Sequence, residues 1–137
     1  MTTKQWLESA KGITIEIVAL EREKDEAALQ AAKVTHDITD KIARTGRTRN
    51  DAALVKYADS GYIARIDKRL AELREQLNEI SAAIYSIPPG VERMVLINLY
   101  ILFKDVKDTA ASMNYYPSNI YKIRDKALKR IELGNHG

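Results

Sequence analysis

The chain has 137 residues, of which 45% are hydrophobic and 30% are charged, and it contains only 3 prolines. This balance is typical of a folded protein and argues against general disorder, and the length allows one ordinary domain or two small ones. The absence of cysteine excludes disulfide bonds, thiolate metal sites and cysteine nucleophiles. No basic segment followed by an apolar run opens the chain, so we expect no secretory signal and a cytoplasmic location.

The excess of positive charge lies in the C-terminal part of the chain. Residues 1–87 carry 14 basic and 14 acidic side chains, whereas residues 88–137 carry 8 and 5, which accounts for the formal net charge of +3. The longest apolar run, Met94 to Phe103, is half of the roughly 20 residues that a bilayer crossing needs, so we expect a buried core helix there and no membrane partner.

Residues from about Lys4 to Ala43 are predicted to form one long helix. This stretch has no proline and one glycine, and apolar or small residues recur from Ile13 to Ile42 at spacings of three, four and once seven positions, which place them on one face of a helix. At about 1.5 Å per residue the helix would reach on the order of 60 Å, so it needs a partner helix to cover its apolar face. The glycine, threonine and asparagine residues of the stretch 44–50 interrupt the pattern and are expected to form the tip of a hairpin.

A second long helix is predicted from about Ala52 to Ser86. Its apolar residues alternate between spacings of three and four, which is the heptad pattern of a coiled coil. We expect this seam to serve assembly, either by pairing within one chain or by forming a homo-oligomer, in the first instance a dimer. The seam consists of Ile63, Ile66, Leu70, Leu73, Leu77, Ile80 and Ile84.

Pro88-Pro89-Gly90 must end the second helix, because proline lacks the N–H that the helix ladder requires. We therefore predict a helical hairpin in residues 1–87 and a second domain in residues 88–137. Three shorter helical patterns follow the break, and the chain as a whole is predicted to be all-α. These helices are expected at Val91–Phe103, Val106–Met113 and Pro117–Leu133.

The last two of these helices have the spacing of a helix-turn-helix. Ala110 is small where two helices cross, and Asn114, four residues later, tolerates the left-handed conformation of the turn. Ile120 and Ile123 are spaced to pack the second helix inward. Asp105 can cap the first of the two helices, and Pro117 suits the first turn of the second.

Several segments of this region, including Ile87-Pro88-Pro89, Val106–Ala111 and Ile120–Arg124, resemble region 4 of sigma factors over about residues 85 to 133. The order of a heptad-rich front and this C-terminal domain is similar to phage and prophage regulators of the RinA/ArpU type. The sequence departs from the sigma pattern where Phe103 and Asn114 replace glycines and Tyr116 replaces a serine or threonine cap.

The resemblance implies a transcriptional regulator that binds double-stranded DNA, with helix 117–133 in the major groove, and that also contacts RNA polymerase. The outward face of this helix supplies the candidates for base contact, and its basic residues supply those for phosphate contact. The base candidates are Ser118, Asn119, Tyr121 and Lys122, and the phosphate candidates are Arg124, Lys126, Lys129 and Arg130.

Other interpretations of the same residues stay open. A basic helix end such as Lys129 and Arg130 also complements the helix dipole, and Tyr115 has the spacing of a packing residue. The chain as a whole suits a protein-interaction module or a DNA-packaging adaptor that combines a helix-turn-helix with helical oligomerisation. A secondary hypothesis places a contact with nucleic acid or polymerase at the basic hairpin tip, which carries Lys41, Arg44, Arg47 and Arg49.

No catalytic, metal or cofactor site is expected. His36 and His136 are far apart in the sequence, and Asp105 and Asp108 stand where a helix cap and a first-turn acid belong. The sequence has no phosphate-binding glycine loop and no histidine near a candidate nucleophile. We therefore expect a binding protein and not an enzyme.

Overall fold

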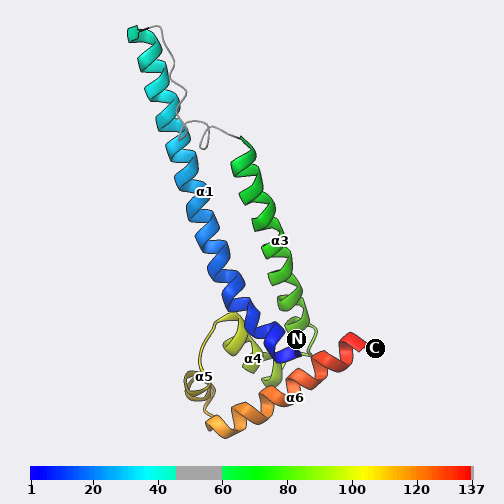
Figure 1. Ribbon diagram of the computed structural model, residues 1–137. Helices are drawn as coiled ribbons and strands as arrows, with labels where there is room; N and C mark the ends of the chain where they lie inside the picture. Colours follow the sequence, from blue (N-terminus) through cyan, green and yellow to red (C-terminus); the bar gives the residue numbers. More distant parts are fainter. Residues whose placement is uncertain (46–59, 137) are drawn as a thin grey trace. The chain divides into compact units, whose positions relative to one another are not determined.

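The computed structural model describes residues 1–45 and 60–136, which are helical apart from short connections and the chain start (Figure 1). The all-α class predicted from the sequence is confirmed, with long helices preceding shorter ones. The elements are α1 (Thr3–Thr45), α3 (Ser60–Tyr85), α4 (Val91–Leu96), the π-helical turn η1 (Ile97–Ile101), α5 (Val106–Met113) and α6 (Pro117–His136). Within the described ranges, no helix combines the length and the apolar character that a membrane crossing requires.

Contacts along the chain divide it into two compact units. One, here called the hairpin unit, is Glu16–Arg74, and the other, here called the core unit, combines Met1–Ile15 with Glu75–Gly137. The unit that contains α4, α5 and α6 therefore also contains the first turns of α1 and the last part of α3. The predicted boundary at residues 87 and 88 assigned those two segments to the hairpin alone.

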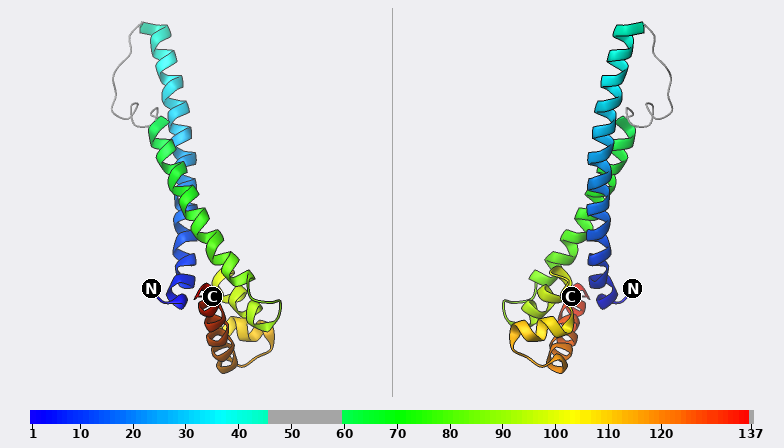
Figure 2. Two further views of the ribbon diagram at one scale, coloured as in Figure 1. Left: turned by 90° about the vertical axis from the view of Figure 1, so that its right-hand side faces the viewer. Right: turned by 90° about the vertical axis from the view of Figure 1, so that its left-hand side faces the viewer.

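In the hairpin unit, α1 and α3 run antiparallel, and the two helices lie side by side in Figures 1 and 2. Glu16 of α1 accepts from Arg69 of α3 at 3.0 Å, whereas Glu23, further along α1, accepts from Tyr62, earlier in α3. Two more ion pairs, Lys24–Asp67 at 2.6 Å and Arg74–Glu21 at 2.7 Å, flank the contact. These pairs lie at the surface, where solvent screens their attraction, so apolar burial supplies most of the stability.

The first turn of α1 is closed by a capping box. The Thr2 hydroxyl accepts from the Gln5 backbone N–H at 3.1 Å, and the Gln5 side chain accepts from the Thr2 N–H at 2.9 Å. These reciprocal bonds satisfy donors that the start of a helix leaves free. The cap fixes where α1 begins, four residues before Leu7 enters the core.

The main apolar cluster of the core unit joins residues from both ends of the chain. Leu7 and Ala10 of α1 are buried with Ile80 and Ile84 of α3, and the cluster continues through Ile87 into the C-terminal helices. Leu96, Tyr100, Ala127 and Ile131 complete it. The C-terminal helices therefore complete their core with residues of α1 that precede them in the chain by about 85 to 125 positions.

The helix predicted over Val91–Phe103 ends earlier than expected. α4 widens into the π-helical turn η1, in which Leu102 N–H donates to the Ile97 carbonyl at 2.9 Å. Phe103 has φ of 56°, which no right-handed helix can continue through. Glycine adopts this left-handed conformation at no steric cost, whereas Phe103 adopts it with its side chain half-buried.

The remaining helix ends lie close to the predicted ones. α5 has the predicted ends, and α6 begins at Pro117 as predicted but continues to His136 instead of Leu133. α1 ends at Thr45, two residues beyond the prediction. The predicted tip beyond Thr45, with Arg47 and Arg49, and the predicted start of the second helix at residues 52–59 lie outside the described residues.

Candidate nucleic-acid interface

The turn between α5 and α6 has the backbone geometry that the sequence predicted. Asp105 caps α5, its Oδ1 accepting from the Asp108 N–H at 2.7 Å. Asn114 ends α5 at φ 58° and ψ 41°, the left-handed conformation in which asparagine is among the few tolerated side chains. Tyr115 N–H then bonds the Ala110 carbonyl at 2.9 Å. The chain thus reverses within three residues before α6 begins.

α6 begins without a side-chain cap of the Ser or Thr type. The backbone carbonyl of Tyr116 accepts from the N–H groups of Asn119 and Ile120, at 2.9 and 3.2 Å. Pro117 needs no partner at this position, since it has no N–H to satisfy. The tyrosine at the cap position therefore does not displace the start of α6.

A small apolar cluster fixes α5 against α6. Val95, Ala110 and Ile120 are buried there, and Ile123 and Met113 pack at its edge. The three buried residues are 0%, 2% and 0% exposed, which confirms the inward orientation predicted for Ala110 and Ile120. Ala110 has the smallest side chain that still fills the contact, so the two helices approach closely.

The candidates for base contact stand on the outer side of α6. Ser118, Tyr121 and Lys122 are exposed, and Asn119 is half-buried. Ser118 and Lys122 are four residues apart and so share one face of the helix. Tyr121 lies on the flank of that face and is 47% exposed.

The four candidates for phosphate contact divide into two kinds. Lys126 and Lys129 are exposed, and within the described residues neither forms an ion pair. Arg130 is paired with Glu92 of α4 at 2.5 Å, and Arg124 is directed inward, with its side chain only 16% exposed. The structure therefore gives the two arginines internal partners and leaves the two lysines at the surface.

Arg124 is held by two neighbours on its own helix. Its Nε and one terminal nitrogen donate to Oδ1 of Asp125 at 3.0 and 2.9 Å. Its guanidinium carbon lies 5.0 Å from the centre of the Tyr121 ring, which is a cation–π distance. Tyr121, Arg124 and Asp125 thus form a connected group in which the guanidinium is largely covered and its two neighbours are exposed.

Two basic residues at the start of α5 were not among the sequence candidates. Lys104 and Lys107 are exposed and flank the cap residue Asp105. They line a depression of about 510 Å³ whose other walls include Tyr121 and Arg124. The sequence signal that could have found them is a pair of lysines beside the cap of α5, because the free N–H groups at the start of a helix attract anions.

Tyr100 lies at the base of the same depression and belongs to the main core. Burial raises the pKa of its hydroxyl, and the neighbouring positive charge of Arg124 partly opposes this effect. The depression therefore holds a neutral hydroxyl at physiological pH.

The assembly seam is covered within a single chain. Five of its members are buried and Ile63 and Leu77 are half-buried, in a hairpin whose other helix is α1. The buried members are Ile66, Leu70, Leu73, Ile80 and Ile84. Because α1 covers this apolar face, a second chain cannot pack on it while the hairpin keeps this conformation. The dimer therefore stays a prediction.

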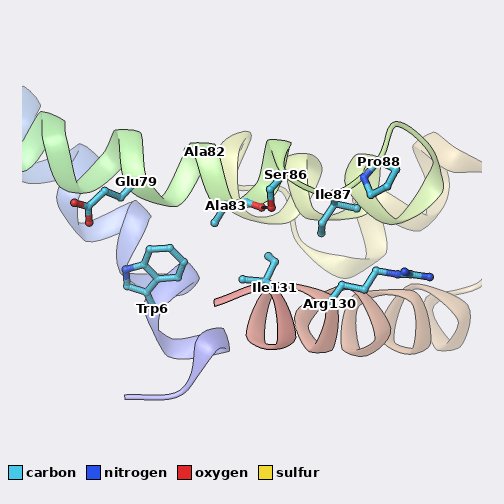
Figure 3. A pocket seen from close by; sticks show the side chains of 10 residues that line it. Trp6, Glu79, Ala82, Ala83, Ser86, Ile87, Pro88, Arg130 and Ile131 are labelled. Carbon is cyan, nitrogen blue, oxygen red and sulfur yellow. Dashed lines mark hydrogen bonds between the residues drawn. The ribbon is translucent and has the colours of Figure 1, made fainter. Parts of the chain in front are cut away.

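A groove of about 740 Å³ lies elsewhere in the core unit, where α1, α3 and α6 meet (Figure 3). The Trp6 ring faces it from the first turns of α1, with Ala83 and Ile87 on one side and Ile131 on the other. Arg130, which is paired with Glu92, stands at its edge. The groove borders the side of α6 that faces away from Ser118 and Lys122.

Comparisons of this chain with family models, with curated proteins and with solved structures find no match.

Proposed function

We propose that the chain is a sequence-specific DNA-binding transcriptional regulator of the phage or prophage type that acts in the cytoplasm and inserts α6 into the major groove. The observation that carries the proposal is the α5–α6 pair. Its turn passes through left-handed Asn114, its contact is fixed by Ala110 and Ile120, and its outer face is polar and basic. This combination is the one that helix-turn-helix proteins use to present a helix to base edges.

The exposed side chains support a division of labour along α6. Ser118, Asn119, Tyr121 and Lys122 occupy the N-terminal half, which enters the groove in such proteins, whereas Lys126 and Lys129 follow towards the C-terminal end. Lysine donors suit guanine O6 and N7 when they reach the base edges and suit phosphate oxygens at the groove wall. Lys104 and Lys107 place two further exposed cations at the start of α5, beside the exposed carboxylates of Asp105 and Asp108.

Contact with RNA polymerase and assembly into a dimer belong to the same proposal and rest on the resemblance to sigma region 4 and on the heptad pattern. Because the described seam is covered by α1, a dimer would use a different surface or a rearranged hairpin. Light scattering of the purified protein distinguishes a monomer from a dimer.

The test is to measure the affinity for a pool of promoter duplexes by fluorescence anisotropy at about 50 and 200 mM salt. Each counterion that binding releases from the DNA makes the affinity fall more steeply with salt. Lys122→Ala should reduce discrimination between sequences, by about 1–3 kcal/mol at one position. Lys129→Ala should weaken binding to every sequence and lower the salt slope by about one. Both side chains are exposed, so neither change should affect folding.

One observation favours a protein-interaction module as the second candidate. Arg124 and Arg130 are engaged with Asp125 and Glu92 and so add less to a phosphate-binding surface than their number suggests. If the wild-type protein binds no duplex even at about 50 mM salt, where electrostatic binding is strong, the regulator is refuted and this candidate takes its place.

A further inference from the structure

An acidic side chain stands in the middle of the face that α6 presents to DNA under the proposed function. Ser118, Lys122, Asp125 and Lys129 follow one another at spacings of four, three and four and are all exposed. A carboxylate among basic residues repels phosphates and lowers affinity for duplex DNA in general. Its position therefore needs an explanation other than general attraction to DNA.

Asp125 is also held in place. The two Arg124 nitrogens that bond Asp125 donate to the same oxygen, Oδ1. The other carboxylate oxygen, Oδ2, therefore has no partner in the described part of the chain. Arg124 itself is largely buried and stacks on Tyr121, which leaves it little freedom to move. The carboxylate is thus a pre-oriented acceptor, 60% exposed, with one oxygen available to a ligand.

The bases differ in what they offer a carboxylate. In the major groove, cytosine itself presents only a donor, at N4, whereas guanine presents only the acceptors N7 and O6. Adenine pairs its N6 donor with the N7 acceptor, which repels a carboxylate, and thymine presents O4 and a methyl group. An acceptor-only side chain therefore favours cytosine over the three other bases.

We propose that Asp125 is a specificity-determining residue that selects a cytosine next to the base read by Lys122. Three helical residues span about 4.5 Å along α6, which is close to the separation of adjacent base pairs, so the two side chains reach neighbouring positions of one site. This inference rests on the proposed function.

The experiment is selection from a randomised duplex pool, followed by anisotropy on the selected sites, for wild type, Asp125→Asn and Asp125→Ala. Asparagine keeps the oxygen that Arg124 binds and places an amide donor where the free Oδ2 of Asp125 stands, which suits a base that presents only acceptors at N7 and O6, namely guanine. We expect Asp125→Asn to change the preference at one position from cytosine to guanine, and Asp125→Ala to lose about tenfold discrimination there. Both variants should bind random duplex more tightly than wild type.

Glu132→Gln is the matched control. Glu132 is another exposed acid on α6, near its C-terminal end, so its removal changes the charge equally without touching the proposed base contact. The Glu132→Gln protein should bind random duplex more tightly than wild type and should still select the same site as wild type. An Asp125→Asn protein that selects the wild-type base at every position would overturn the inference while leaving the proposed function intact. A wild-type protein that selects no site would overturn both.

Discussion

Substitution of Leu7 tests whether the first turns of α1 belong to the fold of the C-terminal helices. Its side chain is 0% exposed and packs in the cluster that contains Leu96, Ala127 and Ile131. Leu7→Ala leaves a cavity there, and changes of this kind cost about 2–5 kcal/mol. We expect a loss of about 3 kcal/mol in the free energy of unfolding of the core unit. For a unit of under 100 residues, such a loss lowers the melting temperature on the order of 10–20 °C.

Hydrogen exchange of the α6 amides measures this effect far from the substituted residue. A loss of about 3 kcal/mol corresponds to exchange that is faster by about two orders of magnitude wherever it proceeds through opening of the core. Leu29→Ala is the control, because Leu29 lies on the same helix but is 71% exposed. Unchanged exchange in α4 and α6 of the Leu7→Ala protein would show that residues 88–137 fold independently and would refute this reasoning.

Two further predictions concern the turn and the core. Asn114→Ala should lower stability by about 1 kcal/mol, because φ of 58° is costly for alanine, whereas Asn114→Gly should be nearly neutral, and urea unfolding of both variants checks this difference. Tyr100 has a raised pKa through burial, so the folded chain keeps a proton that the unfolded chain loses near pH 10. Its contribution to stability is therefore complete below about pH 10 and declines as the pH rises through the folded pKa. Tyr100→Phe should reduce the loss of stability between about pH 9 and 11, whereas Tyr116→Phe, at a 78% exposed position, should not, and equal slopes in both variants would contradict the assignment.

Much of the candidate site follows from local sequence signals. The cap at Asp105, the left-handed turn at Asn114 and the start of α6 at Pro117 each depend on the conformational preferences of one or two residues. The inward orientation of Ala110 and Ile120 follows from helical periodicity, which the sequence displays directly. The same periodicity predicted both long helices of the hairpin.

The tertiary structure decided which of the basic residues have partners within the chain and what completes the core. Arg124 and Arg130 carry the same charge as the exposed lysines of α6, yet Arg124 is largely buried beside Asp125 and Arg130 is paired with Glu92 of α4. The burial of Leu7 with Ile131 likewise joins residues that are more than 120 positions apart. Periodicity states which face of a helix is apolar but not which other helix covers it, because that choice depends on the packing of all the helices together.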